Sequence, residues 1–187
     1  RGLGDVYKRQ IQDKLIVPKN QLIELTKGSL TLGNLIVEPF AVSHDAADPI
    51  GINVFAGKDK ATVVTDTGVI SDSILRRMDD TTLLVLEANY DPHMLRFGPY
   101  QPFLKQRVAS DEGHLSNEMA AQALLMMNRP DFMQVILAHR SENNNNAVLV
   151  TQTIGKMLVD GGVRIGPEMK LQHGQPNEIV SMKSVKR

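Results

Sequence analysis

Short apolar runs rich in β-branched residues follow one another early in this sequence, and helical patterns separate them later. Runs of this kind, bounded by Gly, Pro or Asp, are typical of β-strands, and Gly57-Lys58-Asp59 reads as a hairpin turn. Strands are expected at 35–42, 51–55, 61–65, 82–86 and 135–138, edge strands within 11–35, a closing hairpin at 169–172 and 178–182, and helices at 71–78, 116–127 and 146–159. Antiparallel strands followed by strand–helix alternation predict a layered α/β domain.

Composition narrows the classes of protein and site. Apolar residues make up 42% and charged residues 22% of 187, as in a globular protein. Lys+Arg and Asp+Glu balance at 21 each, so net charge favours neither a nucleic-acid nor a membrane partner. Without cysteine, any metal must be held by His, Asp or Glu. No apolar run approaches the roughly 18 residues of a membrane span. No signal peptide is visible, so a cytoplasmic protein without a membrane partner is expected.

The first ten residues are interpreted separately from the rest. Residues 5–10 read DVYKRQ, which is the translation of a transposon end used in sequencing-library preparation. A native loop is the alternative, but the match extends over all six residues. We therefore expect 1–10 to be a sequencing-adapter scar, and 11–187 to be the C-terminal portion of a single domain that continues upstream.

Four residues with catalytic or metal-binding chemistry stand where predicted strands end or a predicted helix begins. His44, Asp66 and His139 each follow an apolar strand, and His114 precedes a helix. Strand ends that meet at one sheet edge are where α/β proteins place ligands and catalytic groups. Imidazoles and carboxylates suit Zn²⁺, Mn²⁺ or Fe²⁺, and a carboxylate can bridge two cations. The set therefore predicts a metal site.

Each residue also has a simpler interpretation. A lone His after a strand is usually a cap or a surface residue, and Asp66 can be a turn former before Gly68. His114 can be an exposed residue at the start of a helix, and Asp45 can serve only to shape the turn before Pro49. What favours a site is the ordered set, with each member at its own strand end. The remaining histidines, His93 and His173, are expected at the surface or in contact with the metal ligands without binding the metal themselves.

Together, the segments around these four residues resemble those of the metallo-β-lactamase fold. His44, Asp66 and His139 resemble its third, fourth and fifth metal motifs, which follow a His-x-His-x-Asp-His motif. Over residues 33–160 the chain resembles, more narrowly, the YycJ/WalJ-type exonuclease family. The segments that carry this resemblance are SHDAADPIG, TDTG, LEANYDPHML, GPYQPFLKQRV, GHLSNEMAAQAL and LAHRSENNNN. Tyr90 stands where that family often has His, and Arg140 where it often has Leu.

The resemblance implies a four-layer αββα sandwich, with its N-terminal part missing from this chain, and a site for two divalent ions, Zn²⁺ or Mn²⁺. Asp66 would bridge both ions, His44 would bind one and His139 the other. A hydroxide held between the ions would attack a phosphodiester of DNA. His114 matches a segment of tRNA-processing ribonucleases in which a His lies near the scissile phosphate. It is therefore expected to contact phosphate or to protonate the leaving group.

Supporting roles follow from the same resemblance. Ser116 and Asn117, at the start of a helix, are expected to bind substrate phosphate. Asn89 and Asp91 are expected to orient the ligands from behind.

An absence sets the limit of the expected activity. No His-x-His segment occurs anywhere in the 187 residues, so this chain is expected to bind metal poorly and to be inactive alone. The leading hypothesis is a metal-dependent phosphodiesterase, acting as a DNA exonuclease in the full-length protein. The alternatives are a hydrolase of the same fold acting on a small phosphodiester or ester, and a binding module that has lost catalysis. The sequence does not predict an oligomeric state.

Overall fold

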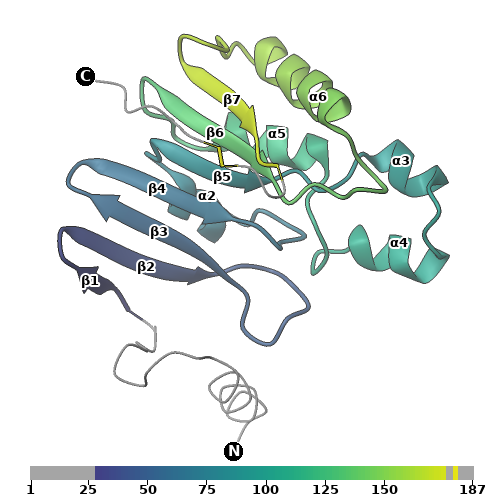
Figure 1. Cartoon of the computed structure of the whole chain (residues 1–187), viewed down its shortest axis with the longest axis horizontal. Coiled ribbons are helices and arrows are strands. Elements are labelled where there is room, and N and C mark those ends of the chain that lie inside the picture. The colour runs from purple at the N-terminus through teal and green to yellow at the C-terminus, as the bar shows by residue number, and fades with distance from the viewer. Residues whose placement is uncertain (1–27, 176–178, 181–187) are drawn as a thin grey trace, which may run out of the picture.

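A single mixed β-sheet forms the centre of the computed structural model, which describes residues 28–175 and 179–180 (Figure 1). Its seven strands lie side by side in the order of the sequence. The first four pair antiparallel, and the pairs from β4 to β7 are parallel. The strands are β1 (Leu30–Leu32), β2 (Leu35–Ala41), β3 (Ile50–Ala56), β4 (Asp59–Val64), β5 (Leu83–Glu87), β6 (Met133–Ala138) and β7 (Met169–His173).

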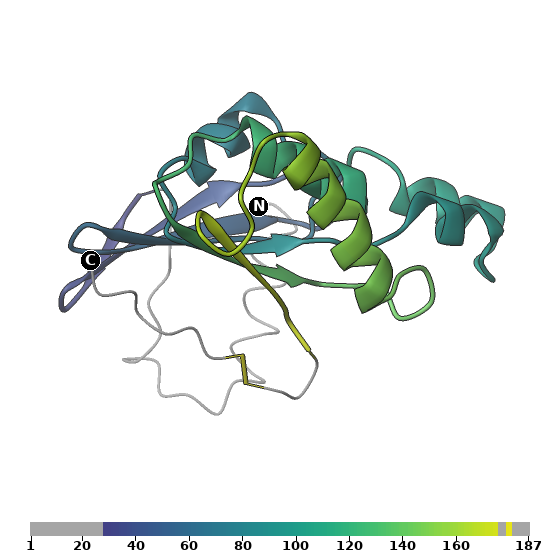
Figure 2. The ribbon, with the colours of Figure 1, turned by 90° about the horizontal axis from the view of Figure 1, so that it is seen from above.

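Five helices accompany the sheet in the described part of the chain. They are α2 (Asp72–Met78), α3 (Pro92–Phe97), α4 (Pro102–Val108), α5 (Asn117–Met126) and α6 (Ala147–Asp160). Seen along the sheet, α2, α5 and α6 lie on one of its faces (Figure 2). Helices α3 and α4 project beyond the carboxyl ends of the parallel strands (Figure 1). None of the described helices combines the length and apolar character of a membrane span.

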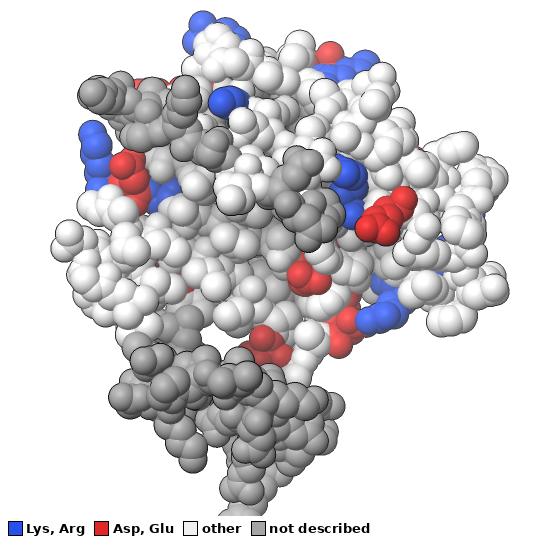
Figure 3. All heavy atoms as spheres, viewed as in Figure 1, with Lys and Arg blue, Asp and Glu red and all other residues white. Residues whose placement is uncertain are grey.

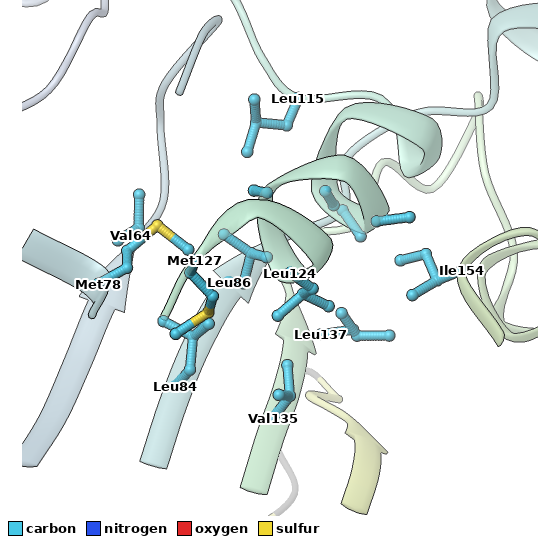
Figure 4. Close-up of a cluster of buried hydrophobic side chains, with 14 of the residues drawn as sticks. Val64, Met78, Leu84, Leu86, Leu115, Leu124, Met127, Val135, Leu137 and Ile154 are labelled. Atoms are coloured by element: carbon cyan, nitrogen blue, oxygen red, sulfur yellow. The ribbon is translucent and has the colours of Figure 1, made fainter. Parts of the chain in front are cut away.

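The main core lies between the sheet and helices α2, α5 and α6. Alternate residues of the central strands point toward the helices, because successive side chains of a strand face opposite sides. Leu84 and Leu86 of β5 and Val135 of β6 are completely buried there, against Leu124 of α5 and Ile154 of α6 (Figure 4). Each such side chain contributes roughly 1.5–3 kcal/mol when it leaves water. This layer fixes the strand ends that carry the site.

The predicted α/β class is confirmed, and the described residues form one sheet and one helical layer. The predicted internal strands and the three predicted helices are present within a few residues of their expected bounds. Helices α3 and α4 were not predicted. Residues 169–172 of the predicted closing hairpin lie in β7, which pairs parallel with β6, and the two described residues of its second arm, 179–180, form no strand. Most of 178–182, and residues 11–27 of the predicted edge strands, lie outside the described residues.

A candidate metal centre at the carboxyl edge of the sheet

Strand direction brings the predicted residues together. Strands β2 and β4 are both antiparallel to β3, and β4, β5 and β6 are parallel, so all four end at one edge. His44 follows β2, Asp66 follows β4 and His139 directly follows β6. Glu87 is the last residue of β5, and His114 lies on the loop before α5. The edge therefore gathers three imidazoles and two carboxylates.

Two glycines let the loop of His114 approach this edge. A Cβ added to Gly68 would lie 2.2 Å from the Ser110 carbonyl oxygen, and one added to Gly113 would lie 2.3 Å from that of Arg107. Neither position has room for a side chain. The resulting close contact places the His114 ring between those of His44 and His139.

The Asp66 carboxylate lies between two of the imidazoles. Its Oδ1 is 3.7 Å from Nε2 of His44 and 3.5 Å from Nε2 of His139. The His114 ring centroid is 5.1 Å from that of His44 and 5.2 Å from that of His139. Donor atoms that share a tetrahedral ion, with bonds of about 2.0–2.2 Å, lie about 3.3–3.6 Å apart. The Asp66 distances are thus close to those of donors that share an ion.

Hydrogen bonds at Nδ1 turn the other ring nitrogen of each histidine toward the site. Nδ1 of His44 lies 3.0 Å from the Gly113 carbonyl oxygen, and Nδ1 of His114 and of His139 each lie 2.7 Å from Oε1 of Glu87. A carbonyl or carboxylate oxygen accepts only, so each Nδ1 carries the proton and donates. In the neutral ring Nε2 then keeps its lone pair, which is the arrangement that metal-binding histidines need.

Glu87 is the buried acceptor that links two of these rings. Its side chain is fully buried, and its Oε2 accepts from the backbone N–H of Thr67 at 3.0 Å and of Leu115 at 3.5 Å. Burial alone would raise the pKa of Glu87, but the hydrogen bonds from His114, His139 and Thr67 outweigh it and hold the pKa below its ordinary value. Glu87 is therefore ionised at neutral pH.

The hydrogen bond with Glu87 also shifts the pKa of His139. Its hydrogen bond to Glu87 raises the pKa of His139; burial opposes this shift, and the charges of Glu87 and Asp66 add to it. The sequence did not single out Glu87 as a site residue. The only sequence signal for Glu87 is its place as an acidic residue directly after an apolar run.

Backbone strain is concentrated at two of these residues. Asp66 has φ 54° and His139 has φ 52°, both in the left-handed region that costs a non-glycine residue about 1–3 kcal/mol. Local hydrogen bonds hold the conformation of His139. The side-chain amide of Asn89 donates to the His139 carbonyl oxygen at 2.8 Å, and the Ser141 N–H donates to the Asn89 carbonyl oxygen at 2.9 Å. Asn89 thus contacts the backbone of His139, and we propose that it helps to orient this residue.

Three other predicted residues make contacts inside the protein. Asp91 caps α3, accepting the Met94 N–H at 2.8 Å. Ser116 caps α5 and is buried. Asn117 is fully buried and exchanges side-chain hydrogen bonds of 2.8 and 3.2 Å with Asn145. Because the side chains of Ser116 and Asn117 are already engaged, we propose that they shape the loop of His114 instead of touching substrate.

Residues expected only to shape turns or the surface have defined contacts as well. Asp45 forms an ion pair with Arg107 of α4, which holds the pKa of Asp45 below its ordinary range. This pair ties α4 to the loop of His44. His93 packs its ring on Phe97, with centroids 4.6 Å apart, and Nε2 of His173 lies 2.8 Å from the Thr151 hydroxyl.

The residues at this edge fit divalent metal ions. Possible ligand atoms lie within 4.8 Å of one another in two groups, one of His44, Asp66 and His114, the other of Glu87, His114 and His139. Nitrogen and oxygen donors of this kind suit Zn²⁺ or Mn²⁺. Glu87 already accepts two imidazole N–H groups, so we assign it to positioning the rings and not to metal binding.

Comparison with known proteins gives consistent family matches. Residues 2–139 match the family model described as the beta-lactamase superfamily domain. The chain is 33% identical over 161 residues to exodeoxyribonuclease YycJ of Bacillus anthracis, covering 86% of this chain and 61% of that protein. It is 33% identical over 147 residues to exodeoxyribonuclease WalJ of Streptococcus pneumoniae, covering 79% and 55%. The chain therefore spans little more than half the length of these relatives.

Solved structures share the fold at low sequence identity. The metallo-β-lactamase fold protein YhfI of Bacillus subtilis has a TM-score of 0.61 at 15% identity, covering 89% of this chain and 59% of that one. Zn²⁺-bound PqqB of Methylobacterium extorquens has a TM-score of 0.57 at 16% identity, covering 91% and 57%. At these identities the likeness concerns the fold alone.

Proposed function

The chain belongs to the β-lactamase superfamily and has the metallo-β-lactamase fold, and from this we propose that the protein is a metal-dependent phosphodiesterase acting on DNA as an exonuclease. One observation carries the metal-dependent part: the Asp66 carboxylate lies between Nε2 of His44 and Nε2 of His139. The choice of DNA rests on the two similar exodeoxyribonucleases.

We further propose that this chain supplies one side of a two-ion site, as the C-terminal portion of a longer protein. His44, Asp66 and His139 offer only a few donors for two ions, and no His-x-His segment occurs in the sequence. The similar exodeoxyribonucleases extend well beyond the matched region. A His-x-His-x-Asp-His segment upstream would supply the remaining donors.

Each residue of the edge then has a role that its contacts support. Asp66 would bridge the two ions, with His44 on one and His139 on the other. The chemistry that such ions supply is activation of water and neutralisation of charge on the phosphoryl group. Glu87 holds the rings of His114 and His139 in one orientation and one tautomer. We assign to His114 proton donation to the leaving oxygen from Nε2 of its doubly protonated ring, while the Nδ1–H stays bound to Glu87.

The function is tested on the protein completed by its upstream reading frame. With Mn²⁺ or Zn²⁺ it should shorten a 5′-labelled single strand. The variant Asp66→Asn should lose this activity by about a hundredfold or more, because the bridging oxygen pair is lost. The control Asp48→Asn removes an exposed carboxylate from the same region and should behave as the wild type. Hydrolysis of bis-p-nitrophenyl phosphate without any cleavage of DNA would refute the nuclease.

Metal binding by the 187-residue chain is a separate test. Isothermal titration with Zn²⁺ or Mn²⁺ should show binding weaker than micromolar, since most of the donors for two ions are lacking. Sub-micromolar binding at two sites would contradict the proposal that the chain supplies only one side of the centre. An upstream reading frame without further His or Asp ligands would instead favour a binding module.

A further inference from the structure

Arg140 lies beside the candidate metal centre and directly follows His139. Its guanidinium forms no hydrogen bond or ion pair with any residue in the described part of the chain, and its Nη1 is buried there without an acceptor. Arginine stays charged at every physiological pH. A buried N–H donor of a charged group is expected to have an acceptor, so this one calls for a ligand.

Two hollows in the surface meet at this residue. The larger, of about 660 Å³, is also lined by His139, Asn145 and Asn146. The smaller, of about 390 Å³, is lined by His114 and His139 as well as by Arg140. Arg140 therefore lines both the hollow that contains His114 and His139 and the larger neighbouring hollow, which His139 also lines.

Nearby groups leave the positive charge of Arg140 uncompensated. Glu142 lines both hollows but is exposed and forms no ion pair with Arg140 within the described residues. His173 has a lowered pKa, first through burial and then through the charge of Arg140, so it is neutral. An anion in the larger hollow would therefore lie near one fixed positive charge, that of Arg140.

The rest of the visible surface offers no broad basic field. On the face seen in Figure 3, Lys and Arg side chains are few and are interspersed with acidic ones. The net charge of the sequence is zero. A polyanionic substrate must therefore be held by individual contacts near the site instead of by a general attraction.

We propose that Arg140 binds the backbone phosphate next to the one that is cleaved, and that the larger hollow receives this part of the strand. The inference rests on the proposed phosphodiesterase function. His139 and Arg140 are consecutive and line the same two hollows, so a strand whose phosphate lies at His139 carries its next phosphate toward Arg140. The planar guanidinium fits two phosphate oxygens at once. A small diester has no second phosphate, so Arg140 selects a polynucleotide.

Binding without catalysis tests this contact directly. A labelled single strand is titrated in EDTA with the 187-residue chain, and fluorescence anisotropy gives the Kd at several salt concentrations. Arg140→Gln should weaken binding about tenfold. It should also reduce the slope of log Kd against log salt by about 0.7, which corresponds to one phosphate contact on a single strand. Arg140→Lys should keep the salt slope but lose part of the affinity, because it keeps the charge without the planar fork.

Two control variants separate a local contact from overall charge. Arg76→Gln removes the same charge from an exposed position on α2 and should change the Kd less than twofold. Glu142→Gln removes the negative charge beside the hollow and should tighten binding. Thermal unfolding of Arg140→Gln should match the wild type, since its guanidinium has no hydrogen-bond or ion-pair partner among the described residues.

The proposed contact of Arg140 with phosphate can be disproved without disproving the proposed phosphodiesterase function. If Arg140→Gln binds the strand with the wild-type Kd and salt slope, the inference is wrong, although metal-dependent cleavage of DNA would still stand. The inference is also wrong if the chain does not bind the strand, or if inorganic phosphate displaces it at concentrations near the Kd of the strand. A loss confined to Arg140→Gln supports the contact even where no cleavage is found.

Discussion

Asp66 and His139 face each other across the carboxyl edge of the sheet, with Oδ1 and Nε2 3.5 Å apart and both backbones in the left-handed region. One further described residue outside glycine, Asp80, has such a backbone. At Asp66 and His139 the strain coincides with side chains that converge on one point. Strain of this kind persists where surrounding contacts fix it, and here the contacts come from Asn89 and from the loops after β4 and β6.

Glu87 should be essential for the stability of this edge. Glu87→Gln keeps the size of the side chain but replaces one acceptor oxygen with an NH₂ group and removes the charge. His114 and His139 already share Oε1, which becomes neutral in the variant, and the new NH₂ group cannot accept the N–H of Thr67 that Oε2 binds. We expect the free energy of unfolding to fall by about 2 kcal/mol. Chemical denaturation of the metal-free chain measures this loss.

A neighbouring carboxylate provides the matched control for Glu87. Glu112→Gln changes an exposed acidic residue on the loop of His114 and should leave stability within about 0.5 kcal/mol of the wild type. Equal effects of the two variants would mean that the buried bonds to His114 and His139 add nothing to stability.

The prediction of these residues from the sequence depended on strand direction. His44, Asp66 and His139 follow apolar strands, and the direction of a strand fixes the edge at which its end lies. Glu87 could not be predicted in the same way, because its partners His114 and His139 are distant in the sequence and only the packed loops bring them to it.

The helices that were not predicted have a local cause. Helices α3 and α4 are short, and each begins at a proline, Pro92 and Pro102, which suggests a loop when it is read alone. Proline is favoured at the first helical position, because its missing N–H has no partner there in any case. The four consecutive asparagines at 143–146 likewise do not predict a particular structure when the sequence is read alone. In the structure Asn145 pairs with Asn117 and Asn146 caps α6.

The role of His114 as a proton donor can be separated from a role as a metal ligand. In the protein completed by its upstream reading frame, His114→Ala should slow cleavage of DNA by roughly 10²–10⁴-fold, the usual contribution of a general acid. Bis-p-nitrophenyl phosphate has a leaving group that needs no proton, so its hydrolysis should fall far less. If both substrates lose activity equally and metal content falls, His114 is a ligand instead.

The buried pair of Asn117 and Asn145 should affect stability without affecting substrate binding. Asn117→Ala leaves one side-chain N–H of Asn145 without its acceptor in the interior, although Asn145 keeps its bonds to Ala88 and Asn146, and the free energy of unfolding should fall by about 1–3 kcal/mol. Combining it with Asn145→Ala should cost less than the sum of the two single losses, since both remove the same contact. A raised Kd for a single strand, with unchanged stability, would restore the substrate-binding role expected from the sequence.

The pH dependence of stability can be tested away from the metal centre, at Glu168. Hydrogen bonds from the side chain and then the backbone of Arg164 lower the pKa of Glu168 below its ordinary value of 4.5. A carboxyl whose pKa is lower in the folded state stabilises the protein above its unfolded pKa. This contribution is lost as pH falls through the folded pKa. The Tm of the wild type should therefore exceed that of Glu168→Gln at pH 7, and the difference in Tm should disappear below pH 4.5.

Because the pair of Arg164 and Glu168 is exposed to solvent, added salt should reduce the difference in Tm at pH 7. A difference in Tm that is the same at pH 7 and pH 3 would show that the charge of Glu168 has no part in it.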